Sequence, residues 1–486
     1  MDTQYWLWLS AISLVSYFCV NTLAWRMHDL YYNLKQRNKE YPLPPGDLGW
    51  PFIGNMLTFL KHFSSGHPDL FINNIVSKHG RNGIYKTHLF GNPSIIVSEA
   101  EMCKRVLTDD EKFKTGYPKS TIEVVRCKSI WSFSKEEHRR FRRLISSLTM
   151  GHSTLETYLT RIDDIVINSL EELSSMSHPV EFLKETKTIS FNIIIDIILG
   201  SYNQHIINKI GNSFTEMYTA LFSMPINLPG FAYRKGLVAR EKLGKLVKPI
   251  VEERRLMIKK GERKDLLDVL LQAKDEDGWK PEDEDIIDIL IGIVLAGHEA
   301  TASGMMWSMV YLTQNPHTLE KAKKEQEEIM KTRLPTQKHL TLKDIKKMNY
   351  LSQVINEMMR LTSMNFAIFR EATSDVNING YTIPKGWKVL TWIRAIHMNP
   401  TYYPNPEQFN PSRWNDHNTK VGSFLPFGAG SRYCPGSDLA KIEISIFLHY
   451  FLLNYKLELV NPKCPITSLP SPKPTDNCLA KVIKNA

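Results

Sequence analysis

The hydrophobic pattern begins with an uncharged, mostly apolar run over residues 5–25. Its length matches the roughly 20 residues that a helix needs to span a bilayer. Asp2 is the only charged residue before this run, whereas four Lys and Arg residues follow it within residues 26–39. Because basic residues stay on the cytosolic side of a membrane, the pattern predicts a retained anchor with the rest of the chain in the cytosol. A cleaved signal peptide is the alternative, but the run lacks a basic n-region and a clear small-residue cleavage site.

A proline-rich stretch separates the apolar run from the rest of the chain. Residues 42–51 contain four prolines, and proline both fixes φ and removes a hydrogen-bond donor, which excludes a helix here. The stretch is typical of a semi-rigid connection. We therefore predict an anchor over residues 1–25, a basic and Pro-rich linker over residues 26–55, and one large domain over residues 56–486.

Periodicity divides that domain into many helices and a few strands. Two strand-like runs, residues 84–90 and 94–97, predict a hairpin whose turn lies at residues 91–93. Helical periodicity then dominates in segments near residues 136–148, 155–175, 205–222, 237–260, 283–314, 317–331 and 345–361. Short strand-like runs return at residues 376–381, 388–392 and 455–459. The predicted fold class is mainly α with small peripheral β-sheets.

Composition and charge narrow the classes of function. Of the 486 residues, 42% are hydrophobic and 23% are charged, as in a folded globular protein. The net charge of +10 suits an anionic membrane surface or an acidic protein partner. No zinc-finger spacing or RNA-binding motif supports binding of nucleic acid. The six cysteines are widely spread and form no disulfide framework, which favours a reducing compartment.

A glycine-punctuated loop carries the most specific chemistry. Residues 427–436 read Phe-Gly-Ala-Gly-Ser-Arg-Tyr-Cys-Pro-Gly and lead directly into an amphipathic helix. The glycines let the backbone approach a flat group, and the helix N-terminus and Arg432 favour a thiolate at Cys434. A lone cysteine is often an inert core residue. Zinc would need a second Cys or His nearby, and Gly428 and Gly430 do not fit the spacing of a dinucleotide loop.

The string Phe-Gly-x-Gly-x-Arg-x-Cys-x-Gly resembles the haem-binding signature of the cytochromes P450. The resemblance covers the whole chain and implies the P450 fold with an N-terminal transmembrane helix in the endoplasmic reticulum membrane. It also implies haem b, with Cys434 as the axial iron ligand and Phe427, Gly428 and Gly436 as neighbours of the haem. The implied activity is that of an NADPH- and O2-dependent monooxygenase. Since the chain has no nucleotide-binding fingerprint, electrons would come from a separate NADPH–cytochrome P450 reductase, an acidic partner for the basic surface.

Further motifs match the family in the same order along the chain. Four cations match the family's contacts to the haem propionates: His138, Arg142, Arg370 and Arg432. Glu357 and Arg360 lie three residues apart, on one helical face. With Arg413, which follows in a Pro-bent loop, they resemble the family's Glu–Arg–Arg lock. We assign these three residues a structural role.

The helix predicted over residues 283–314 has Ala-Gly-His-Glu-Ala-Thr at its centre, residues 296–301. Taken alone, the stretch reads as a buried helix with a few polar residues. His298 and Glu299 begin the H-E-x-x-H motif of zinc proteases, but Ala302 occupies the second histidine position. Beside Cys434, the stretch is similar to the oxygen-activating groove of the P450 central helix, with Glu299 and Thr301 suited to relaying protons.

At one position the chain departs from the family. P450s commonly have Thr, sometimes Ser, directly after the acid, whereas this chain has Ala300 there and Thr301 one step later. One step rotates a helical side chain by about 100°, so Thr301 does not replace the missing hydroxyl from the same direction. The sequence predicts that water or a substrate hydroxyl completes the relay, or that oxygen use is poorly coupled to product.

The residues expected near the substrate are mostly apolar, which favours a large hydrophobic substrate. They comprise the loop of residues 118–131 together with Val294, Ala296, Gly297, Asn365, Phe366, Ala367, Ile368 and Leu469. No cation for a substrate carboxylate stands out among them.

Three strings, residues 64–69, 85–94 and 377–381, are similar to a plant P450 group that contains ent-kaurenoic acid oxidases and legume β-amyrin 11-oxidases. The resemblance implies oxidation of a hydrophobic plant terpenoid: β-amyrin at carbon 11, to the alcohol and then the ketone, in triterpenoid saponin biosynthesis. Oxidation of ent-kaurenoic acid in gibberellin biosynthesis is the alternative. A further alternative is a haem-thiolate protein in which Ala300 impairs oxygen activation.

Overall fold

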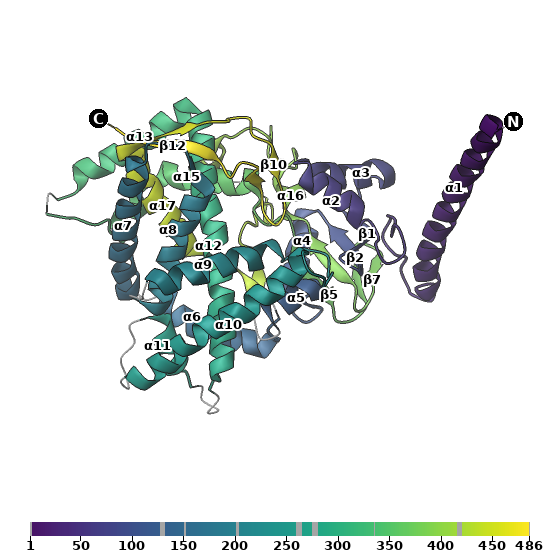
Figure 1. The fold of residues 1–486 in the computed structure, drawn as a ribbon, viewed down its shortest axis with the longest axis horizontal. Coiled ribbons are helices and arrows are strands. Elements are labelled where there is room, and N and C mark those ends of the chain that lie inside the picture. Colours follow the sequence, from purple (N-terminus) through teal and green to yellow (C-terminus); the bar gives the residue numbers. More distant parts are fainter. Residues whose placement is uncertain are drawn as a thin grey trace.

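The fold is built mainly from helices, with small sheets in more than one part of the molecule (Figure 1). The computed structural model describes residues 2–126, 132–149, 152–200, 204–258, 265–274, 280–334, 336–415 and 420–485. Its α-helices are α1 (Asp2–Lys35), α2 (Met56–Ser64), α3 (Asp69–His79), α4 (Ala100–Thr108), α5 (Lys119–Val125), α6 (Lys135–Thr149), α7 (His152–Ser175), α8 (Phe182–Leu199), α9 (Gln204–Thr219), α10 (Ala232–Met257), α11 (Leu266–Leu271), α12 (Asp283–Gln314), α13 (Pro316–Thr332), α14 (Leu342–Lys347), α15 (Asn349–Thr362), α16 (Ile393–His397) and α17 (Ser437–Asn454).

The strands are short and form four small sheets. They are β1 (Ile84–Leu89), β2 (Asn92–Val97), β3 (Phe113–Thr115), β4 (Val180–Glu181), β5 (Ile368–Ala372), β6 (Val376–Ile378), β7 (Tyr381–Ile383), β8 (Lys388–Thr391), β9 (Tyr455–Leu459), β10 (Ile466–Thr467), β11 (Lys473–Pro474) and β12 (Leu479–Lys484). Two 3-10 turns, η1 (Pro411–Trp414) and η2 (Gly430–Arg432), complete the elements. The prediction of a mainly α fold with small β-sheets is confirmed.

The long helix α12 lies at the centre of the helical part. It packs against α8, α10, α15 and α17, and both ends of it contribute to large hydrophobic clusters. Helix α8 was not predicted because apolar residues surround almost its whole circumference, so it lacks the amphipathic period that marks a surface helix. α8 and α12 pack side by side as core helices.

The largest sheet joins distant parts of the chain, in the order β1-β2-β8-β5-β3. β1 and β2 pair antiparallel, and β2 pairs parallel with β8. The predicted hairpin is present, but its turn is tighter than predicted: Leu89 pairs with Asn92, which leaves only Phe90 and Gly91 in the loop. Both have positive φ, 52° and 73°, as a tight two-residue hairpin turn requires. Pro93 therefore belongs to the strand.

Helix α1 begins the chain and continues beyond the predicted end of the anchor at residue 25, as far as Lys35. Residues 8–35 are a candidate membrane span, and no residue of its 18-residue apolar window is buried. α12 passes the same test of length and hydropathy, but 72% of its 18-residue window is buried, as for a core helix. Figure 1 shows α1 (purple) standing beside the rest of the molecule.

Candidate active site

A cavity of about 450 Å³ lies between α12 and the loop that carries Cys434. It brings together most of the residues predicted from the sequence: His138, Ala296, Gly297, Glu299, Ala300, Thr301, Asn365, Ile368, Arg370, Phe427, Gly428, Arg432, Cys434 and Gly436. These residues come from four separate parts of the chain. The cavity is therefore one site that only the fold assembles.

The cysteine loop is shaped by its glycines. The Cys434 amide donates to the Phe427 carbonyl (3.0 Å), which closes the loop before α17 begins. Gly428 and Gly430 have φ of 77° and 74°, a conformation that favours glycine. A Cβ at Gly430 would lie 2.6 Å from the Leu107 carbonyl oxygen, whereas a Cβ at Gly436 would meet nothing within 4 Å. The loop thus packs tightly on its outer side and leaves space on the cavity side.

The thiol of Cys434 is not activated in the way that the sequence suggested. Burial raises the pKa of Cys434, and the backbone hydrogen bond at Gly436 and the charge of Arg142 offset this only in part. Arg432 instead donates to the Phe133 carbonyl (2.8 Å). A bound metal would supply the missing stabilisation of a Cys434 thiolate, since a coordinated thiol is deprotonated.

Buried cations gather at one edge of the cavity. Arg370 is only 4% exposed, and its Nε has no hydrogen-bond partner among the residues that the structure describes. Burial and the nearby Arg432 lower the pKa of Arg370. Burial, followed by the charges of Arg432 and Arg142, lowers the pKa of His138 to about 4. Such a cluster is stable only with an anion beside it.

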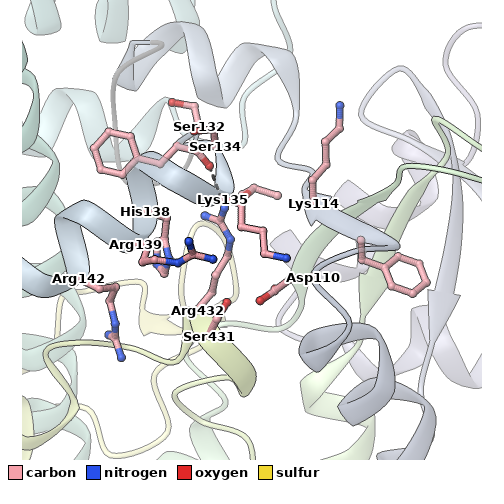
Figure 2. Close-up of a pocket in the computed structure, with 13 residues that line it drawn as sticks. Asp110, Lys114, Ser132, Ser134, Lys135, His138, Arg139, Arg142, Ser431 and Arg432 are labelled. Atoms are coloured by element: carbon pink, nitrogen blue, oxygen red, sulfur yellow. Dashed lines mark hydrogen bonds between the residues drawn. The ribbon is translucent and has the colours of Figure 1, made fainter. Parts of the chain in front are cut away.

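A second pocket of about 370 Å³ adjoins this edge and shares His138 and Arg432 with the cavity. Figure 2 shows Lys135, Arg139 and Arg432 reaching into it. Asp110 is the only carboxylate among the described residues that line it. Arg142 lines this pocket, not the main cavity, and donates to the Tyr433 carbonyl (2.8 Å).

The exposed side chains of helix α12 in the cavity are small and apolar. Ala296 and Ala300, one turn apart, are its exposed residues there. The Thr301 hydroxyl donates to the Gly297 carbonyl (2.8 Å), so it is already committed to the helix backbone. The rotation expected from the sequence is therefore present: Ala300 occupies the cavity-facing position and offers only a methyl group.

Glu299 is buried between Lys187 and His298. Its Oε2 lies 2.8 Å from Nζ of Lys187 on α8, and its Oε1 lies 3.5 Å from Nε2 of His298. Burial acts to raise the pKa of Glu299, but His298 and Lys187 together outweigh it, so the pKa lies below its ordinary value. The Lys187 side chain is 22% exposed, so Glu299 stands between the cavity and a group that reaches solvent. Sequence reasoning missed Lys187 because α8 was not predicted.

The predicted lock of Glu357, Arg360 and Arg413 is closed. The Arg360 guanidinium donates to both carboxylate oxygens of Glu357 (2.9 Å each), and Arg413 Nε donates to Oε1 (2.8 Å). Trp414 Nε1 (3.0 Å) and the Asn410 amide (3.0 Å) donate to the same carboxylate. Glu357 and Arg360 are completely buried. The lock therefore ties α15 to η1 before the cysteine loop.

Several residues predicted to face the substrate lie in the hydrophobic core. Val294 packs in the cluster between α8, α10 and α12. Phe366 and Ala367 pack with the rings of Phe63 and Trp392, and Leu469 lies at the border of the same cluster. Pro470 lies on the cavity wall beside it. The physical reason is side-chain direction. Neighbouring residues point to different sides of an element, so a continuous range chosen from the sequence includes residues that face the cavity and residues that face the core.

The loop predicted over residues 118–131 forms α5 in its first part, and Thr121 of α5 lines the cavity. Residues 127–131 lie outside the described residues.

The model of the cytochrome P450 family matches residues 44–479. The chain belongs to the cytochrome P450 family. It is 63% identical to a β-amyrin 11-oxidase from Glycyrrhiza uralensis, over 99% of both chains. It is 48% identical to ent-kaurenoic acid oxidase 1 from Arabidopsis thaliana, over 93% of both chains. Among solved structures, the retinoic acid-bound cyanobacterial CYP120A1 superposes with a TM-score of 0.83 at 28% identity, over 92% of this chain and 100% of that one.

The residues of this P450 fit a haem b group. Cys434 stands at one face of the cavity, Ala296 and Ala300 stand at another, and Nε of the buried Arg370 has no hydrogen-bond partner among the described residues. Cys434 would ligate the iron, and Arg370, Arg432 and His138 would hold the propionates. When bound, a thiolate-ligated haem supplies the cleavage of the O–O bond. As a P450 monooxygenase, the protein oxidises a hydrophobic substrate with electrons from a redox partner.

A second buried acid of the cavity, Glu443 on α17, makes stability depend on pH. Burial raises its pKa to about 8, and only Ser190 Oγ (3.4 Å) offsets this. Between pH 4.5 and 8 the folded state therefore keeps a proton that the unfolded state loses. We expect the free energy of unfolding to fall with rising pH in this window, by about 1.4 kcal/mol per unit from this group.

Glu443→Gln should remove that part of the pH dependence, as measured by urea unfolding at several pH values. Glu328→Gln, at an exposed position, is the matched control and should leave the slope unchanged. Equal slopes for wild type and Glu443→Gln would show that Glu443 is ionised in the folded protein.

Proposed function

We propose that this P450 oxidises β-amyrin at carbon 11, first to the alcohol and then to the ketone, in triterpenoid saponin biosynthesis. The single observation that carries the proposal is the 63% identity to a β-amyrin 11-oxidase over 99% of both chains. In each step, one oxygen atom of O2 enters the substrate and the other leaves as water, with two electrons from NADPH through a separate reductase. The geminal diol formed in the second step then loses water to give the ketone.

The chemistry of the cavity supports a neutral, hydrophobic substrate. Among its described lining residues, the cations Arg370 and Arg432 belong to the haem edge, as does His138. The remaining histidine, His397, is fully buried, and burial with the charge of Arg360 lowers its pKa to about 3. No cation is thus left for a substrate carboxylate, which disfavours ent-kaurenoic acid. The 48% identity to an ent-kaurenoic acid oxidase keeps that reaction as the second candidate.

In this proposal, Glu299 passes protons to the cavity, and an ordered water or a substrate hydroxyl takes the place of the hydroxyl missing at Ala300. The apolar part of α1 anchors the protein in the endoplasmic reticulum membrane. Lys135 and Arg139, beside the second pocket, belong to the basic surface that an acidic NADPH–cytochrome P450 reductase would contact.

Product analysis tests the proposal. The full chain is co-expressed with a plant P450 reductase in cells that make β-amyrin and, separately, in cells fed ent-kaurenoic acid. We expect β-amyrin products heavier by one oxygen and by the ketone increment, identified by mass spectrometry. Cys434→Ser serves as the control and should give none. Oxidation of ent-kaurenoic acid alone would overturn the proposal in favour of the second candidate, and no product from either would favour a protein disabled at Ala300.

Restoring the hydroxyl at position 300 should improve coupling. We expect Ala300→Thr to raise the ratio of product formed to NADPH consumed several-fold, because a hydroxyl at this cavity-facing position can pass a proton inward. Ala296→Ser, one turn away, controls for adding a hydroxyl to the same surface. An unchanged ratio, measured by NADPH consumption against product, would mean that water already completes the relay.

A further inference from the structure

We propose that α1 is docked onto the catalytic domain by an ion pair between Asp29 and Lys86, so that the membrane span and the domain turn together as one rigid body. A spanning helix needs only about 20 residues, and α1 continues past the apolar run to Lys35. Its last turns therefore extend out of the membrane. Within them His28, Asp29 and Tyr32 are partly buried although the helix as a whole is exposed.

Lys86 is the centre of the contact. It lies on β1, its side chain is only 7% exposed, and its Nζ is 2.8 Å from Asp29 Oδ1. It also donates to Asn33 Oδ1 (3.2 Å), while Asn33 Nδ2 donates to the second carboxylate oxygen of Asp29 (2.8 Å). In the described part of the chain no other carboxylate forms an ion pair with Lys86. Because an unpaired buried ammonium is strongly unfavourable, the domain depends on α1 for its counter-charge.

Ring contacts extend the docking along the same face of α1. Tyr32 meets the buried ring of Trp387 edge to face, with centroids 5.5 Å apart and an angle of 89°. His28 Nδ1 lies 3.0 Å from the Gly49 carbonyl oxygen, and its ring lies 5.3 Å from that of His88. His28 and Tyr32 are four residues apart, as are Asp29 and Asn33, so all four share one side of the helix.

The segment after α1 is held as well. Lys39 forms an ion pair with Asp375. Thr382 of β7 donates from its hydroxyl to the Tyr41 carbonyl (2.8 Å) and from its amide to the Pro42 carbonyl (2.8 Å). The connection between α1 and the domain is thus bonded to the domain at Lys39, Tyr41 and Pro42. It is not a free hinge.

The docking places an apolar loop beside the anchor. Gly49, which contacts His28, is followed by Trp50, Phe52 and Ile53, whose exposed fractions are 39%, 89% and 40%. Figure 1 shows α1 running along the side of the molecule that carries α2 and α3. With α1 fixed, this loop is held against the same lipid surface that receives the span, and Trp50 suits its interfacial region.

The test measures the orientation of the domain in a membrane. The full-length, haem-loaded chain is reconstituted in lipid nanodiscs, and linear dichroism of the aligned discs reports the tilt of the haem plane. We expect one narrow tilt for the wild type and a broad distribution for Asp29→Asn and Lys86→Gln. Asp29→Asn should also lower the unfolding temperature by about 3 °C, since it leaves Lys86 buried and unpaired.

Three further variants make the result decisive. Lys35→Gln, exposed on the same helix, carries the same charge change as Lys86→Gln and should keep the narrow tilt. The reversed pair, Asp29→Lys with Lys86→Asp, should restore it, because the Asn33 amide can turn to serve either arrangement. A short Gly-Ser insertion after Trp25 should broaden the tilt by cutting the helix. The proposal is overturned if the wild type is as broad as this insertion variant, or if both single variants keep the wild-type tilt.

Discussion

Glu299→Gln should lower the rate of product formation by about 100-fold, the usual contribution of a positioned proton-transfer group. The carboxylate of Glu299 is the only acid that the described part of α12 turns towards both the cavity and Lys187. A glutamine has nearly the same shape but cannot hold a proton for delivery. Binding of the hydrophobic substrate should change little, because Glu299 is buried against Lys187 and His298.

Turnover and the spectral dissociation constant of the substrate measure these two effects separately. Glu284→Gln, at an exposed position on the same helix, is the matched control and should behave as the wild type. Lys187→Met tests whether protons travel between solvent and Glu299 through Lys187. It should lower the rate of product formation and raise the pKa of Glu299, whereas Lys187→Arg should restore both to their wild-type values. A wild-type rate for Glu299→Gln would show that protons reach the cavity by another route.

Glu357→Ala should prevent accumulation of the folded haem protein. The Glu357 carboxylate accepts hydrogen bonds from Arg360, Arg413, Trp414 and the Asn410 amide. Its loss leaves the fully buried guanidinium of Arg360 without a counter-charge. Breaking one partner of a buried ion pair costs about 3–5 kcal/mol, which is a large fraction of the stability of a typical protein.

The yield of haem-bound protein and the urea midpoint of any soluble fraction measure this loss. Glu320→Ala, on the exposed surface of α13, removes the same side chain and should change neither. A Glu357→Ala protein with wild-type yield and midpoint would mean that water or the neighbouring carbonyls satisfy Arg360. In that case the lock would not be structural.

The sequence predicted those parts of the site that depend on local spacing. Glu357 and Arg360 are three residues apart on a helix, so their contact follows from the helical repeat alone. Cys434 was identified by a loop whose glycines and following helix are adjacent in sequence. The rotation between Ala300 and Thr301 was likewise a local property of one helix, and the structure adds only that the Thr301 hydroxyl donates to Gly297.

Contacts between distant elements could not be predicted in this way. Lys187 pairs with Glu299 from a core helix that has no amphipathic period, so no pattern indicated that the two would meet. The state of the Cys434 thiol depends on burial, which a motif does not contain. Asp29 and Lys86 meet only because the last turns of α1 lie against β1. Each case requires the packing of two elements that are separate in sequence.

The parallel pairing of β2 with β8 has a consequence for how the protein is made. Ser94 of β2 pairs with Lys388 of β8. The sheet therefore cannot be completed until β8, almost three hundred residues later in the chain, has been synthesised. Such long-range pairing is slow to form, and a ribosome adds only about 5–20 residues per second. If α1 spans the membrane as proposed, it enters the membrane before Trp387, the ring partner of its Tyr32, has emerged from the ribosome. During that interval β2 presents an open edge, and a chain that stops before β8 never closes it.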